Sequence, residues 1–170
     1  MIKPLLFFIL ILLSGFSRVE SALHVSGKVW QTHEYCGGAR PSPEMLERIT
    51  TARPLANKKC YVRKGHVNNL KEPVVATFVS DTGGNFSVKL PPGNYCIIDE
   101  KKLNRDFVEE IARMHKKADE YNDAADLNCL KSWLTAPDAV FTVKKGENKI
   151  EVTYHFPCSW NSTPCVTYHG

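Results

Sequence analysis

The sequence predicts a mainly β protein, a seven-stranded antiparallel β-sandwich with one helical insertion and a short helix in a loop. Three observations lead to this prediction. Residues 73–100 alternate apolar and polar side chains in three short runs separated by two turn sequences. Similar alternation recurs at 23–31, 58–64 and 139–156. Only residues 103–122 replace it with the three-to-four-residue spacing of a helix.

The N-terminal residues 1–21 have the pattern of a secretory signal peptide. A positive charge near the start precedes Leu5–Leu13, an apolar run too short to span a bilayer, and small residues follow. Cleavage is expected after Ser21, with Ser17 and Ala22 as alternatives. We therefore expect a secreted or periplasmic protein, with no stable membrane span after the leader is removed and one domain over residues 22–170.

The charged residues do not indicate a nucleic-acid ligand. The formal net charge is +4, and the lysines occur as scattered pairs rather than as a basic stripe interleaved with aromatic residues. The sequence contains no Gly-x-Ser-x-Gly, His-Glu-x-x-His or phosphate-binding loop. We expect no nucleic-acid partner and no cofactor.

The N-terminal part of the domain is expected to contain a strand, a long loop and a short helix. The strand is Leu23–Gln31, and the loop covers residues 32–56. Loops of this length in compact domains are often functional or disordered. Inside it, Ser42 can cap a helix over 42–49 whose first residue is Pro43.

Two turns join the three central strands. In Asp81-Thr82-Gly83-Gly84-Asn85, Asp81 is expected to accept backbone N–H bonds within its own turn, and Gly84 accepts a positive φ. Pro91-Pro92-Gly93 suits a type II turn with Pro92 and Gly93 as its central residues. These three strands are therefore predicted to be consecutive antiparallel neighbours.

The helical insert is expected over residues 101–137. An apolar stripe predicts one helix at about 103–122, packed on a sheet edge, with partner binding as the alternative. Residues 123–137 would close the insert. A final hairpin is expected from strands 139–144 and 148–156.

The chain has six cysteines, all after the leader, and an even number in an exported protein favours disulfides. Only the pair Cys158–Cys165 is suggested by locality, because prolines and small polar residues between the two cysteines would turn the chain back on itself. Residues 158–165 are therefore expected to form a C-terminal cysteine loop.

The order of the predicted strands resembles the carboxypeptidase regulatory-like domain, which has a prealbumin (transthyretin-like) fold. The most specific resemblance is the pattern around the two central turns, carried by Ser80, Asp81, Gly84, Asn85, Phe86, Leu90, Pro91, Pro92, Gly93 and Tyr95. It covers the core strands and leaves out the 32–56 loop, the 101–137 insert and the cysteine loop. The resemblance implies a noncatalytic accessory, adhesion or binding module.

The same resemblance bears on the remaining cysteines. In that fold the second strand and the strand after the Pro-Gly turn are neighbours in one sheet. This implies a Cys60–Cys96 disulfide, which would leave Cys36 and Cys129 to join the long loop to the insert. The alternative is that Cys60 and Cys96 are small buried thiols.

A few residues are candidates for chemistry or binding. His33, Glu34 and Cys36 lie in one loop and would suit a metal such as zinc, although their spacing matches no closed zinc motif. Cys36, followed by two glycines, can also be interpreted as a nucleophile. Tyr35, Cys36 and Trp160 are the candidate binding residues, because loops on a rigid sandwich usually carry recognition.

These observations favour an exported noncatalytic binding module whose partner is a protein or a glycan. One alternative is a metal- or thiol-dependent hydrolase centred on His33 and Cys36. A second alternative is a structural protein of the cell envelope.

Overall fold

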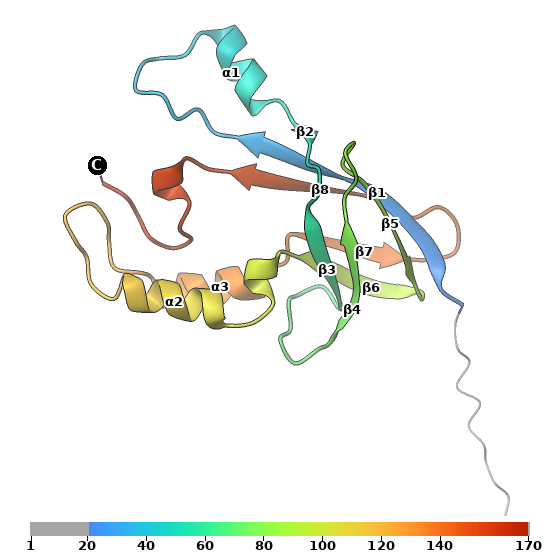
Figure 1. The fold of residues 1–170 in the computed structure, drawn as a ribbon. Helices are drawn as coiled ribbons and strands as arrows, with labels where there is room; N and C mark the ends of the chain where they lie inside the picture. The colour runs from blue at the N-terminus through green and yellow to red at the C-terminus, as the bar shows by residue number, and fades with distance from the viewer. Residues whose placement is uncertain (1–20, 170) are drawn as a thin grey trace, which may run out of the picture.

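The computed structural model describes residues 21–169 (Figure 1). Nearly all of the expected leader lies outside these residues. In chain order the elements are β1 (Leu23–His33), α1 (Pro43–Thr50), β2 (Arg53–Pro54), β3 (Lys59–Lys64), β4 (Val74–Val79), β5 (Asn85–Leu90), β6 (Gly93–Ile98), the 3-10 helix η1 (Glu100–Lys102), α2 (Asp106–Met114), α3 (Leu127–Thr135), β7 (Ala139–Val143), β8 (Lys149–Phe156) and the 3-10 helix η2 (Ser159–Asn161).

The strands form two sheets of four, so the mainly β prediction is confirmed. In the first sheet β1 pairs with β5, β2 and β8, and the second sheet has the order β4-β3-β6-β7. The predicted count of seven and the purely antiparallel pairing are wrong for the described residues. The two-residue strand β2 is added, and β8 runs parallel to β1 from Ser26↔Lys149 to His33↔Phe156.

Successive strands alternate between the sheets more often than predicted. β4 lies in the second sheet, β5 in the first and β6 in the second again, so the two central turns connect sheets rather than hairpin neighbours. The expected C-terminal hairpin is also wrong, because β7 pairs with β6 and β8 pairs with β1. Side-chain alternation fixes which face of a strand is buried, but it does not choose the neighbouring strand.

One buried cluster lies between the sheets and contains side chains from both. The first sheet contributes Val25, Val29, Phe86, Leu90 and Val152, and the second contributes Cys60, Val62, Phe78, Tyr95, Ile97 and Val143. The rings of Phe78 and Phe86 stack across the two layers, with centroids 3.9 Å apart. This shared core gives the strands a sandwich-like arrangement.

The turn after β4 has the predicted local structure. The Asp81 carboxylate accepts the N–H groups of Asn85 and Gly83, and these bonds, that from Asn85 foremost, lower the pKa of Asp81. Gly84 has φ +78°, and a Cβ there would lie 2.6 Å from the carbonyl oxygen of Val29. At the second turn, Gly93 has φ +153° and already begins β6, which does not match the central position of a type II turn.

The two helix predictions differ in accuracy. Helix α1 is found as expected, with the Ser42 hydroxyl accepting the N–H of Met45 at 3.2 Å. The insert, however, contains two helices instead of one over 103–122. Helix α2 ends at Met114, and the chain then turns so that α3 packs against α2 around Val108, Ile111, Leu130 and Leu134. The apolar stripe on α2 therefore packs against a second helix, α3.

The start of the helical insert, η1 and Leu103, lies on the outer face of the second sheet, and helices α2 and α3 lie to one side of the strands in Figure 1. Tyr61, Cys96 and Ile98 on that face are buried beneath it, together with half-buried Leu103. The side chain of Asn68, in the loop after β3, donates to the carbonyl groups of Lys102 and Leu134 at 2.8 Å each. Strand β3 is therefore buried on both faces.

The disulfides are Cys36–Cys158 and Cys129–Cys165, so the predicted Cys158–Cys165 and Cys36–Cys129 pairs are wrong. The parallel pairing of β1 and β8 explains the first bond. Because the two strands are parallel, they end side by side, with His33 opposite Phe156, and the residues that follow them lie close together. This leaves Cys165 to reach Cys129 on α3.

The Cys60–Cys96 disulfide is also absent, and both residues are buried free cysteines. The strands that hold them are neighbours, as the resemblance implied, but Arg63 is the residue opposite Cys96. Cys60 lies an odd number of residues from that position and therefore points to the other face of the sheet. Cys60 faces the core between the sheets, whereas Cys96 lies under the insert.

Candidate functional site

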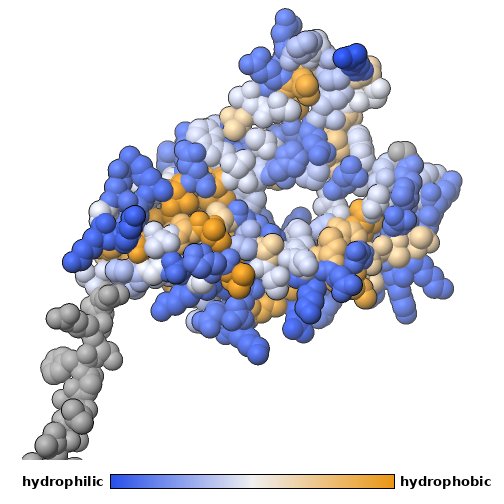
Figure 2. Space-filling model, turned by 180° about the vertical axis from the view of Figure 1, so that it is seen from behind, coloured by the Kyte–Doolittle hydropathy of each residue, from blue (hydrophilic) through white to orange (hydrophobic). Residues whose placement is uncertain are grey.

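A cleft of about 630 Å³ lies between the strands and the helical insert. Figure 2 shows the surface hollowed between these two parts of the molecule. Its lining comes from the end of the second sheet, the insert, strand β8 and the C-terminal segment, residues 157–169. A volume of this size is typical of small-molecule sites in proteins.

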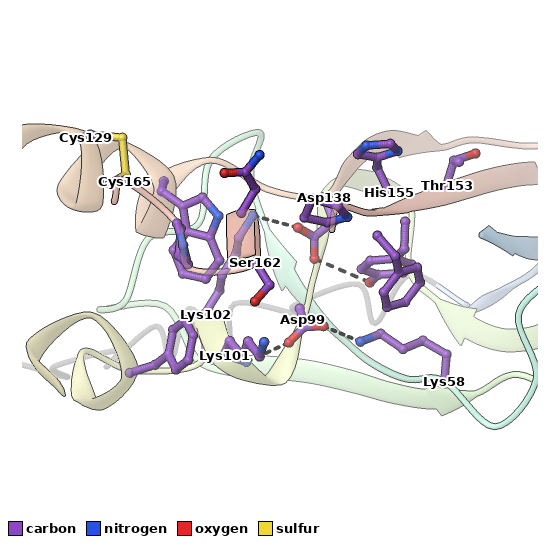
Figure 3. Close-up of a pocket in the computed structure, with 17 residues that line it drawn as sticks. Lys58, Asp99, Lys101, Lys102, Cys129, Asp138, Thr153, His155, Ser162 and Cys165 are labelled. Carbon is purple, nitrogen blue, oxygen red and sulfur yellow. Dashed lines mark hydrogen bonds and ion pairs between the residues drawn. A yellow bond between two sulfur atoms is a disulfide. The ribbon is translucent and has the colours of Figure 1, made fainter. Parts of the chain in front are cut away.

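The floor of the cleft is formed by polar residues at the ends of three neighbouring strands. Lys58 precedes β3, Asp99 follows β6 and Asp138 precedes β7. Because these strands are adjacent and antiparallel, the start of β3, the end of β6 and the start of β7 lie side by side at the same end of the sheet. Lys58 forms an ion pair with Asp99, and Figure 3 shows this pair and Asp138 directed into the same space.

A second ion pair links the floor to the insert. Nζ of Lys102 lies 2.6 Å from Oδ1 of Asp138 and donates to the carbonyl oxygen of Ala136 at 3.0 Å. The two side chains are only 8% and 12% exposed. Charges this far from water are costly unless they are paired, so this bond fixes the position of η1 relative to the sheet.

Asp99 is held in its charged form. Burial by itself would raise its pKa, but the hydrogen bonds from the Lys58 ammonium and the Lys101 N–H outweigh burial. The pKa of Asp99 therefore lies below its ordinary value. At neutral pH this part of the floor presents a carboxylate and an ammonium group side by side.

Tyr154 brings the other sheet into the site. Its hydroxyl lies 3.4 Å from Oδ2 of Asp138 and 3.4 Å from the sulfur of Cys60. Burial, with the nearby Cys60 and Asp138, raises the pKa of Tyr154 far above its usual range. The phenol is therefore neutral and remains a hydrogen-bond donor.

Aromatic rings form much of the cleft wall, and three lysines lie over them. The Nζ atoms of Lys58, Lys101 and Lys102 lie 4.5 Å, 5.0 Å and 4.8 Å from the ring centroids of Tyr154, Phe107 and Trp133, respectively. These contacts limit the motion of long side chains that would otherwise move freely. The cleft thus combines fixed charges with apolar ring surface.

The C-terminal segment closes one side of the cleft, with Pro157, Asn161, Ser162, Pro164 and Cys165 in the wall. The disulfides hold it in two places, at Cys158 to the loop after β1 and at Cys165 to α3. The second disulfide lies at the end of the cleft in Figure 3. This wall is therefore covalently attached both to the loop after β1 and to helix α3 of the insert.

The residues predicted as a metal or nucleophile site do not assemble one. The ring of His33 stacks on Phe156 with centroids 5.2 Å apart, and the sulfur of Cys36 is bonded to Cys158. Glu34 accepts the N–H of Cys158 at 3.2 Å and contacts His155 at 3.3 Å; these bonds, that from Cys158 foremost, lower its pKa. Residues 21–169 contain no cluster of three His, Cys, Asp or Glu residues that would hold a metal.

The predicted binding residues lie apart from the cleft lining. Neither Tyr35 nor Cys36 lines the cleft: the Tyr35 hydroxyl donates to the carbonyl of Ala39 at 2.7 Å, and Cys36 is bonded to Cys158. Trp160 is 45% exposed and lies next to Asn161, a cleft residue. Contact of Tyr35 or Trp160 with a partner stays a prediction.

Sequence reasoning missed the residues that form the cleft. Asp99 and Asp138 stand directly outside predicted strands and Lys58 is the first residue of one, and this position at the ends of strands was the available signal. Using it required knowing that these strands are neighbours. The contributions of Trp133 and Tyr154 depend on how the insert and the other sheet are placed, which the sequence pattern does not specify.

Comparisons with known proteins add little to this description. No family model matches the chain, and no curated protein matches it. One similar solved structure is a DUF3823 family protein from Parabacteroides merdae, with 9% identity, a TM-score of 0.32 and a match over 76% of this chain and 45% of that one. This likeness is too low to carry an argument, so the carboxypeptidase regulatory-like resemblance stays a prediction.

The fold and the site together define a mainly β protein with a helical insert and a charged, aromatic-lined cleft. Among residues 21–169, no helix has the length and apolar character needed to cross a membrane.

Proposed function

We propose that the protein is an exported, noncatalytic binding module that holds its ligand in the cleft between the second sheet and the helical insert. The observation that carries this proposal is the cleft floor. Two lysine–aspartate pairs are held there, at the end of the sheet where β3, β6 and β7 lie side by side. Largely buried charges that are fixed in place can bind hydroxyl, amide or charged groups of a ligand without further ordering.

The ligand class follows from the lining. The aromatic rings of Phe107, Trp133, Tyr154 and Phe156 offer apolar surface beside the paired charges. A ligand that fits must therefore have both an apolar face and several polar groups. A short protein segment and a glycan both meet this requirement, and they are the partners that we propose.

Export and fold type belong to the same proposal. The two disulfides support an oxidising compartment, either secreted or periplasmic, as does the leader-like sequence at residues 1–21. The sandwich-like sheets support a relationship to the prealbumin fold and its carboxypeptidase regulatory-like members. The alternative of a structural envelope protein predicts a cleft with no ligand.

The proposal is tested by thermal-shift and calorimetric measurements on residues 22–170 with native disulfides. The probes are a panel of short peptides and of neutral and acidic oligosaccharides. We expect at least one probe to raise Tm, and its affinity to fall about 10-fold or more in Asp99→Asn and Trp133→Leu. Glu110→Gln, exposed on α2 and outside the cleft lining, is the control. If no probe binds, or if binding is unchanged in both cleft variants, the proposal is wrong.

A further inference from the structure

Three aromatic side chains, one from the helical insert and two from the C-terminal segment, lie close together outside the cleft. The ring centroids of Tyr121 and Tyr168 are 6.5 Å apart, and those of Trp160 and Tyr168 are also 6.5 Å apart. Tyr121 is 50% exposed, Trp160 is 45% exposed and Tyr168 is half-buried. We call these three residues the aromatic platform. None of them lines the cleft.

The backbone beneath the platform is held in place by hydrogen bonds. Asn122 and Tyr168 form an antiparallel bridge, and the N–H of His169 donates to the carbonyl of Tyr121 at 2.8 Å. The carboxylate of Asp119 accepts the N–H groups of Tyr121 and Asn122 at 2.8 Å each, which lowers the pKa of Asp119. The rings are thus presented on a fixed support, and binding to them would require little ordering.

The residues that flank the platform residues in sequence are polar rather than aliphatic. Trp160 stands between Ser159 and Asn161, and Tyr121 stands between Glu120 and Asn122. Nε2 of His169, the residue after Tyr168, lies 3.0 Å from Oδ1 of Asp123. Protein-binding hot spots are usually surrounded by packed groups that exclude water, and this exposed polar border is unlike them.

The charge near the platform distinguishes nucleic acid and acidic sugars from neutral sugars, all of which can stack on aromatic rings. Single-stranded nucleic acid also stacks on such rings, but it needs positive charge along its backbone. Here Asp119, Glu120 and Asp123 place three carboxylates within two residues of Tyr121. The nearest lysines in that segment, Lys116 and Lys117, stand farther from Tyr121 in sequence, so phosphate, sulfate or uronate groups on its ring would meet mainly negative charge. A neutral sugar has no such cost, and its C–H face is attracted to the negative face of an aromatic ring.

We propose that the aromatic platform binds a neutral oligosaccharide, with pyranose rings stacked on Trp160, Tyr168 and Tyr121. The neighbouring carboxylates and amides accept and donate hydrogen bonds to its hydroxyl groups. This site is separate from the site proposed in the cleft, and each could bind its ligand without the other.

The test uses calorimetric titration of the mature protein with cellohexaose, xylohexaose and maltohexaose. We expect one of them to bind, with Kd raised about 10-fold by Trp160→Ala and at least about 5-fold by Tyr121→Ala, as expected for loss of a stacking ring. Trp160→Phe should retain part of the affinity. Met114→Ala, which removes an exposed apolar side chain on α2, should leave Kd unchanged.

Circular dichroism and Tm establish that each variant is folded. The proposal is overturned if none of the three sugars binds, or if Trp160→Ala and Tyr121→Ala both bind as the unaltered protein does. Self-association in sedimentation experiments that is abolished by Trp160→Ala would instead assign the platform to a dimer contact and also overturn the proposal. Loss of sugar binding only in the cleft variant Asp99→Asn would move the ligand to the cleft.

Discussion

Nη1 of Arg63 donates to Oδ1 of Asn68 at 2.7 Å, and both residues are buried, with Asn68 0% exposed. Arg63 also donates to the carbonyl of Leu103, and the Asn68 amide donates to those of Lys102 and Leu134. Two side chains from β3 and the loop after it therefore connect the sheet to both ends of the helical insert. The cleft has a fixed shape because this connection holds its two sides together.

Replacing Asn68 by Ala should destabilise the protein strongly. The substitution leaves two buried carbonyl groups and one guanidinium N–H without their partner, and each such loss costs about 1–3 kcal/mol. We expect the free energy of unfolding in urea to fall by about 3 kcal/mol. The matched control is Asn69→Ala, because Asn69 is exposed and bonds only its own turn. Equal effects of the two variants would contradict this role for Asn68.

The Lys102–Asp138 pair should show strong coupling in a double-mutant cycle. Asp138→Asn leaves a buried ammonium group uncompensated and should cost about 3 kcal/mol, as breaking a buried ion pair usually does. Lys102→Met combined with Asp138→Asn removes both charges and should recover much of that loss. Unfolding measured by guanidinium titration checks this. Additive effects of the two substitutions would show that the pair does not interact.

Asp99 should contribute to stability at neutral pH and lose that contribution in acid. Its pKa in the folded protein lies below the ordinary value of 3.8, so the folded state favours the charged form. The stabilisation is present above pH 3.8 and disappears as pH falls through the lower folded value. Asp99→Asn should therefore be less stable than the unaltered protein at pH 7, with the difference shrinking below about pH 4. A difference that does not change with pH would contradict this.

The thiol content and disulfide map should follow the structure. We expect two free thiols under denaturing conditions, Cys60 and Cys96, and almost none that react rapidly in the native protein, since both are buried. Burial also raises the pKa of both thiols, which further lowers their reactivity. Peptide mapping by mass spectrometry should identify Cys36–Cys158 and Cys129–Cys165. A Cys158–Cys165 peptide would contradict this disulfide map.

Reduction should release the wall of the cleft while leaving the sheets intact. Both disulfides attach the C-terminal segment, and neither crosses the core between the sheets. We expect hydrogen exchange in residues 157–169 to increase under reducing conditions, with β3 and β6 still protected. Uniform loss of protection would show instead that the disulfides are needed for the whole fold.

Local features of this fold could be predicted from the sequence, whereas long-range pairing could not. Ser42 caps its helix and Asp81 closes its turn because both act on backbone groups a few residues away. The alternation at Lys58–Lys64 correctly separated Cys60 from Tyr61, but it did not show that the insert buries the second face. Local sequence patterns specify which face of a strand is buried and where a helix or turn begins. Which strands pair with each other depends on the whole chain.

The same limit explains the errors at the candidate site. The error in the Cys158 pairing came from treating residues 158–165 as a local loop, when the parallel approach of β8 to β1 brings Cys36 nearer. Asp99 and Asp138 are far apart in sequence and meet only because β6 and β7 are neighbours. Trp160 was singled out as a candidate binding residue and is 45% exposed, but its neighbours Tyr121 and Tyr168 were not singled out with it.

The most direct test of ligand binding in the cleft uses the indole N–H signals of the three tryptophans in an NMR titration. Trp133 lies in the cleft wall, Trp160 belongs to the aromatic platform, and Trp30 lies on β1 outside both. The probe is the peptide or oligosaccharide that raises Tm most in the thermal-shift panel. We predict a saturable shift of the Trp133 signal with no change at Trp30. Saturation of binding with the Trp133 signal unmoved would contradict the assignment of the cleft as the ligand site.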